Sequence, residues 1–230
     1  MNAYLEATLF ASVAFSLAAY MLGVKLKQHL KLAIFNPLLV SIIIMIVLLK
    51  VFNIDYQVYN SGAKYLSWLL TPATVCLAIP MYEKWELLKK NVSAVMIGLL
   101  TGVITSLTTV LILSLIFKLS HVEFVTLLPK SITTAIGMGV SEELGGIVTI
   151  TVAVIVVTGV LGNIIGETVC KIFKIKHPIS KGLALGAAAH VIGTAKANEM
   201  GEVEGAMSSL AIVVSGILTV ILAPIFASFM

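Results

Sequence analysis

"LLPKSITTAIGMG", residues 127–139, places a proline, a lysine, three hydroxyl side chains and two glycines inside an apolar chain. Proline and glycine both disfavour a continuous helix. A lysine near the centre of a membrane costs roughly 2.5–3.5 kcal/mol on insertion scales. If the rest of the chain lies in a membrane, this stretch therefore predicts an interrupted membrane segment whose lysine has a functional role.

The composition predicts a membrane protein. Hydrophobic residues make up 59% of the chain and charged residues only 11%, whereas soluble domains carry about 25% charged residues. Residues 91–117, 144–166 and 205–230 contain no charge, and each stretch exceeds the roughly 20 residues that cross a hydrocarbon core. We therefore expect an all-α, polytopic integral protein of the cell membrane.

The expected helical segments number eight, of which about seven cross the membrane. They cover residues 4–24, 37–52, 64–82, 92–117, 122–145, 146–168, 182–201 and 206–229. Three of them are interrupted by Pro, Gly, Thr or charge: 64–82 at "TPAT" (71–74), 122–145, and 182–201. A broken segment precedes an acidic patch and a clean helix in each half, so the single domain 1–230 is expected to contain two structural repeats, 1–118 and 122–230. Paired broken segments of this kind indicate a transporter.

Lysine distribution sets the expected topology. The lysine-rich loops 25–31, 83–90 and 171–181 should face the cytoplasm. All three can do so only if 122–145 enters and leaves the membrane on the outer side, as a re-entrant hairpin. If that segment crosses fully, loop 171–181 lies outside; we favour the hairpin.

The broken segments hold the candidate binding residues. Irregular backbone is tolerated at membrane depth only inside protein or beside a wet cavity, so "TPAT", "PKSITT" and "GTAK" are expected to converge near the middle of the membrane. Lysine, hydroxyls and freed N–H groups at a half-helix start suit a small carboxylate. The candidates are Lys130, Ser131, Thr133, Thr134, His190, Gly193, Thr194, Lys196, Thr71, Pro72 and Thr74.

His190 and Glu199 are the candidates for proton coupling, His190 because its reference pKa lies near neutrality. Structural alternatives stay open for each residue. Lys130 could extend its ammonium to the membrane surface, Lys196 could pair with Glu199 three residues on, and His190 could be a buried, hydrogen-bonded histidine. Thr71 and Pro72 could merely kink a helix.

Several classes of function are not expected. GxSxG, HExxH, P-loop and dinucleotide motifs are missing from the sequence, so we predict no enzyme and no cofactor. Cys76 and Cys170 have no CxxC spacing, and no metal site follows. All 15 basic residues are lysine, whereas phosphate backbones are usually bound by arginine, so nucleic acid is not an expected partner.

Four stretches resemble the LrgB/CidB family. They are "NPLLVSIIIMIVLL" (36–49), "LLTPATVCLAIPMY" (69–82), "LLPKSITTAIGMGVSEELGGI" (127–147) and "HPISKGLALGAAAHVIGTAKANEMGEVEGAMSSLA" (177–211). The resemblance covers nearly the whole chain. At Ala135–Ile136 the chain departs from the family pattern, where many members have proline after the paired threonines, and Gly137 or Gly139 could supply the break instead.

The resemblance implies two different functions. Bacterial members are described as antiholin-like regulators of murein hydrolase export and autolysis, with a small LrgA/CidA-like membrane partner. A plastid relative carries glycolate and glycerate, and bacterial members have been tied to pyruvate. The lysines and threonines at the breaks favour a transporter of a small monocarboxylate or hydroxycarboxylate, acting as a homo-oligomer; the alternative is the antiholin-like regulator, acting by oligomer assembly.

Overall fold

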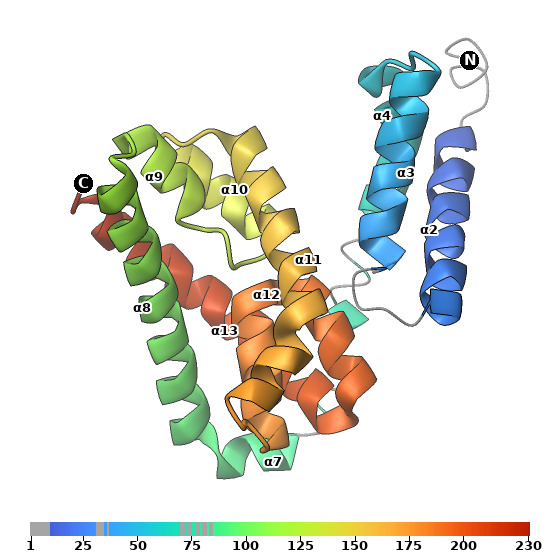
Figure 1. Cartoon of the computed structure of the whole chain (residues 1–230). Coiled ribbons are helices and arrows are strands. Elements are labelled where there is room, and N and C mark those ends of the chain that lie inside the picture. The colour runs from blue at the N-terminus through green and yellow to red at the C-terminus, as the bar shows by residue number, and fades with distance from the viewer. Residues whose placement is uncertain are drawn as a thin grey trace. The chain divides into compact units, whose positions relative to one another are not determined.

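The computed structural model describes residues 10–30, 35, 37–69, 72, 75–76, 79, 82 and 85–230, and all regular elements in these ranges are helices (Figure 1). The chain forms two compact units, 1–76 and 77–230.

The first unit contains α2 (Ala11–Leu30), α3 (Pro37–Val51) and α4 (Tyr56–Trp68). Ser16 Oγ of α2 lies 2.8 Å from the Tyr59 hydroxyl of α4. The prediction of a basic loop at 25–31 is wrong for residues 25–30, because α2 continues to Leu30. Its residues Lys, Leu, Gln and His include no helix breaker, so charge alone does not end the helix.

The second unit contains seven described helices. They are α7 (Trp85–Lys90), α8 (Val92–Phe117), α9 (His121–Leu127), α10 (Thr134–Glu143), α11 (Val148–Ile172), α12 (Pro178–Met200) and α13 (Glu202–Ala227). Three of these, α8, α11 and α13, are long and apolar enough to cross a membrane. This suggests a multi-pass membrane protein; the number of crossings and the two repeats stay predictions.

Helices α9 and α10 form a hairpin, which we call hairpin 1 (residues 121–143). Their 7 and 10 residues give lengths of about 10 and 15 Å, far short of a membrane core of about 30 Å. Ser120 and Glu123 start α9 with a capping box, and Pro129 follows its end. In Figure 1 the chain returns along α10, so that α11 begins at the end of the unit where α8 finishes.

Thr151 of α11 fastens both arms of hairpin 1. Its buried Oγ1 lies 2.8 Å from the Thr126 carbonyl of α9 and 2.7 Å from Ser141 Oγ of α10. In addition, Thr126 Oγ1 accepts a hydrogen bond of 2.8 Å from the Ile147 N–H. The hairpin is thus held against the start of α11.

We predict that Thr151→Val lowers the free energy of unfolding by about 1–3 kcal/mol, because it leaves buried polar groups without a partner. Unfolding of the purified protein in a detergent titration measures the change. The control is Thr168→Val, which alters an exposed threonine of the same helix and should change stability by less than about 0.5 kcal/mol. Equal effects of the two variants would contradict the fastening role.

Helix α12 is a second hairpin, hairpin 2 (residues 178–200), whose tip is at Ala189 and His190. Both residues have non-helical backbone angles, and His190 has a φ of 42°. A Cβ at Gly193 would lie 2.5 Å from the Leu185 carbonyl, although eight residues of straight helix would separate the two by about 12 Å. The chain therefore folds back on itself at the tip.

The two hairpins enter the second unit from opposite ends. Hairpin 1 joins α8 to the start of α11, and hairpin 2 joins the end of α11 to α13, so the length of α11 separates their entrances. Consequently α7 and the connection 173–177 lie at one end of the unit (Figure 1). The backbone of residues 122–145 thus has the hairpin form that we expected, and the described parts of 83–90 and 171–181 lie at one end of the unit. Re-entry of this hairpin into a membrane and the side on which the loops lie stay predictions.

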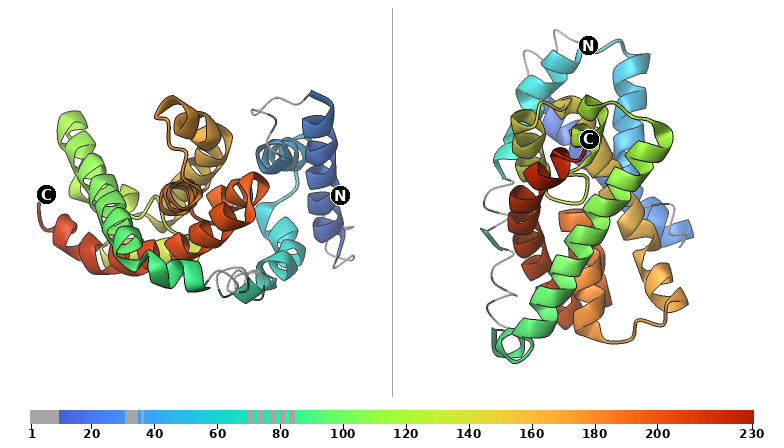
Figure 2. Two further views of the ribbon diagram at one scale, coloured as in Figure 1. Left: turned by 90° about the horizontal axis from the view of Figure 1, so that it is seen from below. Right: turned by 90° about the vertical axis from the view of Figure 1, so that its left-hand side faces the viewer.

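Apolar side chains of α8, α13 and hairpin 1 form a core cluster. Val103 and Leu107 of α8 pack with Phe124 and Leu128 of hairpin 1 and with Ala223 of α13. The end of α13 lies beside the start of α9 (Figures 1 and 2), where His121 Nδ1 is 2.8 Å from the Met230 carbonyl. This packing holds hairpin 1 between α8 and α13.

Candidate functional site

The tips of the two hairpins border one cavity of about 800 Å³, the central cavity. Lys130 and Ser131 line it from hairpin 1, and Ala187 and Ala188 line it from hairpin 2. Helices α8 and α11 supply most of the remaining wall. Its polar lining consists of Thr101, Thr105, Ser106, Thr109, Lys130, Ser131, Thr158 and Ser180.

Lys130 carries the only ionisable side chain among the described residues that line the central cavity. Its Nζ lies 3.1 Å from Ser131 Oγ and 3.5 Å from Ser106 Oγ. No carboxylate in the described part of the chain is within ion-pair distance of this ammonium. The site therefore offers one half-buried positive charge surrounded by hydroxyls.

The contact with Ser106 shows at which level along α8 the Lys130 ammonium lies. Ser106 lies near the middle of the 26-residue helix α8, so the Lys130 ammonium lies at that level and not at either end of the helix. A lysine that merely reached the membrane surface would lie nearer a helix end.

The other candidates in hairpin 1 lie beside the cavity. Thr133 is the extended N-cap of α10 and makes no capping hydrogen bond through its side chain, and Thr134 is the first helical residue. Both are half-buried, and neither lines the central cavity.

The candidate residues at and beyond the tip of hairpin 2 contact neighbouring helices and do not line the central cavity. His190 is 3% exposed, and its Nε2 lies 3.0 Å from the Ile155 carbonyl of α11. Thr194 Oγ1 donates to the His190 carbonyl at 3.0 Å and lies 2.7 Å from Ser208 Oγ of α13. The geometry of His190 is thus that of a buried, hydrogen-bonded histidine, and Gly193 packs on Leu185.

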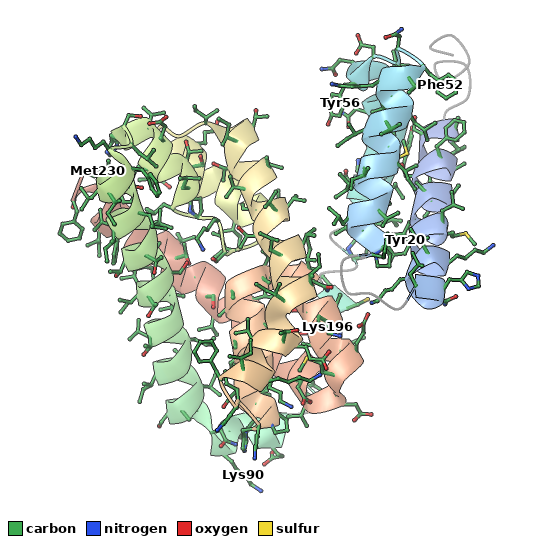
Figure 3. All side chains as sticks on the ribbon, in the orientation of Figure 1. Tyr20, Phe52, Tyr56, Lys90, Lys196 and Met230 are labelled. Carbon is green, nitrogen blue, oxygen red and sulfur yellow. The ribbon has the colours of Figure 1, made fainter. Side chains whose placement is uncertain are left out.

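Lys196 lies in another cavity, which corrects the expected convergence of "PKSITT" and "GTAK". Its Nζ is 2.8 Å from Glu167 Oε2 and 3.3 Å from Glu199 Oε2; Figure 3 labels the residue. The physical reason is the position of the break. Because α12 turns at Ala189–His190, Lys196 lies more than a turn beyond the tip, on the arm that returns to the end of α11.

The remaining candidates belong to "TPAT". Thr71 and Thr74 lie outside the described residues, and Pro72 is an exposed residue of the first unit. Whether this stretch meets the hairpins stays a prediction. No group of three or more metal-ligating side chains occurs in the described part of the chain.

Sequence reasoning missed the polar face of α8. Thr101, Thr105 and Thr109 are spaced by four residues and all line the central cavity. The hydroxyls of Thr101 and Thr109 donate to carbonyls one turn earlier at 2.7 Å, so their oxygens keep lone pairs that can accept hydrogen bonds. The i, i+4 spacing inside an uncharged helix was the available signal.

The family match and the similar proteins both cover nearly the whole chain. Residues 16–229 match the LrgB-like family. Proteins from Bacillus mycoides, Bacillus cereus and Bacillus anthracis, each named antiholin-like protein LrgB, are 40% identical over 223 residues, which cover 96% of this chain and 97% of each relative. No solved structure matches.

Proposed function

The chain belongs to the LrgB-like family, and we propose that it is a cell-membrane transporter, or a transport subunit, for a small monocarboxylate or hydroxycarboxylate. The observation that carries this proposal is the ammonium of Lys130 in the central cavity, which has no carboxylate partner among the described residues. A half-buried charge without a counter-ion is costly, and a bound anion removes that cost.

The charge and the polar groups of the cavity suit such a solute. One ammonium balances one carboxylate, and Ser106 and Ser131 lie within reach of the same ammonium. The threonines of α8 offer acceptors to a hydroxyl on the solute. A cavity with a few polar groups and an otherwise apolar wall is typical of small-molecule sites.

The opposed hairpins support turnover. Sites in many transporters lie where broken helices from two sides of the membrane meet, and access alternates around them. Hairpins 1 and 2 enter from opposite ends and border the same cavity. Movement of either tip would expose the cavity to one side at a time.

The second candidate function is antiholin-like regulation of murein hydrolase export and autolysis by oligomer assembly. The name of the relatives, antiholin-like protein LrgB, favours an antiholin-like role. A homo-oligomer and a small LrgA/CidA-like membrane partner belong to both candidates as proposals.

His190 and Glu199 remain proposed for proton coupling in the transporter, although Glu199 already pairs with Lys196.

Solute uptake by the purified, reconstituted protein separates the two candidates. Proteoliposomes are loaded with buffer and offered radiolabelled glycolate, glycerate, lactate or pyruvate. We expect saturable uptake of at least one of them, competed by its unlabelled form. Absence of saturable uptake, both alone and with a co-reconstituted small partner, would favour the antiholin-like role.

A further inference from the structure

A second cavity, of about 550 Å³, lies where the end of α11 meets hairpin 2, and we call it the basic cavity. It shares no lining residue with the central cavity. Five lysines line it: Lys171, Lys174, Lys176, Lys181 and Lys196.

Two carboxylates in the lining neutralise only part of this charge. Glu167 lies 2.8 Å from both Lys171 and Lys196, and Glu199 lies 3.3 Å from Lys196. Both acidic residues of the basic cavity are therefore already engaged with the same two lysines.

The lining lysines that do not pair with Glu167 or Glu199 are Lys174, Lys176 and Lys181. No carboxylate in the described part of the chain lies within ion-pair distance of any of them. Among the described lining residues, the five lysines thus exceed the two glutamates by three charges. Like charges that line one cavity repel one another. A bound anion would offset this repulsion.

Simpler explanations account for part of the cluster. The carbonyls at the end of α11 favour nearby cations such as Lys171, and the rule for membrane orientation favours lysines at this end of the unit. Neither explanation requires the lysines to line one cavity. Lys89 and Lys90 of α7 lie at the same end (Figure 3 labels Lys90) and do not line it.

We propose that the basic cavity binds a phosphate-bearing anion with more than one negative charge, either the headgroup of an anionic phospholipid or a soluble phosphate compound. Lysine binds phosphate as a point charge, and three ammoniums without a carboxylate partner among the described residues match a multivalent anion better than a monocarboxylate. Ile172 and Phe173 beside the lysines are 68% and 73% exposed, which suits contact with acyl chains. The proposal is independent of the proposed transport.

Binding to the purified full chain in detergent tests the proposal, with native mass spectrometry at low ionic strength as the readout. The probes are a phospholipid with two phosphates, a zwitterionic phospholipid and inorganic pyrophosphate. The variant is Lys176→Gln/Lys181→Gln, and the matched control is Lys89→Gln/Lys90→Gln, which removes equal charge outside the cavity.

We expect the diphosphate lipid, pyrophosphate or both to bind the unaltered protein more tightly than the zwitterionic lipid. A lysine near an anionic surface contributes enough that losing two should weaken binding roughly 30-fold. The control pair should retain affinity within about twofold. Lys176→Arg/Lys181→Arg keeps both charges and should also retain binding.

Retention of the lipid alone would identify the membrane as the source of the anion, and retention of pyrophosphate would identify a soluble source. Preference for neither phosphate probe would overturn the proposal. Equal weakening by the cavity pair and the control pair would also overturn it, because general surface charge would then explain the binding.

Discussion

Lys130→Ala will abolish solute uptake while the protein remains folded and inserted. Lys130 supplies the only charge among the described residues lining the central cavity, so a carboxylate that enters the variant has no counter-ion there. Truncating one partner of a buried, hydrogen-bonded charge pair costs 2–5 kcal/mol or more, which corresponds to a loss of affinity of about 30-fold to several thousand-fold. The measurement is uptake per inserted molecule in proteoliposomes.

Folding should survive this substitution because, in the described part of the chain, the hydrogen bonds of the ammonium go to the hydroxyls of Ser106 and Ser131. Removing a half-buried charge also removes its desolvation cost, so stability is expected to stay level or rise. Lys90→Ala, at the exposed end of α7, is the control and should transport normally. Normal uptake by Lys130→Ala would leave the lysine as a structural feature of the hairpin.

Lys130→Arg separates a binding role from a surface role. The planar guanidinium fork does not reproduce the compact ammonium between two serines, so we expect poor recovery of uptake. If the lysine only reached toward the membrane surface, arginine would replace it almost neutrally.

Hydropathy alone predicts the long helices of the second unit. The expected helix 92–117 coincides with α8, because an uncharged stretch lies between Lys90 and Lys118 and Lys118 adopts a left-handed terminating conformation. Hairpin 1 was also predictable, since Pro129 interrupts the segment and the lysine-rich loops require its two ends to share a side.

The position of the second break was not predictable from local sequence. We expected an interruption somewhere in 182–201 and irregular backbone at "GTAK", but the chain turns within "AAAH" (187–190), which contains neither proline nor glycine. Long-range contacts hold the turn: His190 Nε2 lies 3.0 Å from the Ile155 carbonyl, and Asn163 Nδ2 donates to the Ile192 carbonyl at 2.7 Å. Tertiary packing thus stabilises a backbone conformation that local propensity disfavours.

This displaced break decides which candidates share a site. With a turn at residue 194, Lys196 would have lain near the tip and could have joined Lys130. With the turn at His190, Lys196 instead meets Glu167 of α11, and the polar partners of Lys130 come from α8. The break after α9 has a local cause in Pro129, whereas contacts with α11 determine the break at His190. The binding roles of the candidate residues stay predictions.

Close packing between hairpin 2 and α13 gives the second large effect. We predict that Gly186→Ala lowers the free energy of unfolding by about 1–3 kcal/mol, the usual range for overpacking. A Cβ at Gly186 would collide with the Ser208 carbonyl and lie 2.7 Å from the Ala211 Cβ. Small residues allow membrane helices to approach this closely, and backbone atoms cannot move aside as a flexible side chain can.

Gly139→Ala is the matched control, because this glycine also lies within a helix but no atom of the described residues lies within 4 Å of the Cβ it would gain. Alanine favours helix over glycine by up to about 1 kcal/mol, so this variant should be neutral or slightly more stable. Unfolding in a sodium dodecyl sulfate titration compares both with the unaltered protein. Since uptake is proposed to require the tip of hairpin 2 beside the central cavity, Gly186→Ala should also reduce transport per folded molecule. Unchanged stability of Gly186→Ala would mean that hairpin 2 and α13 are not packed this closely.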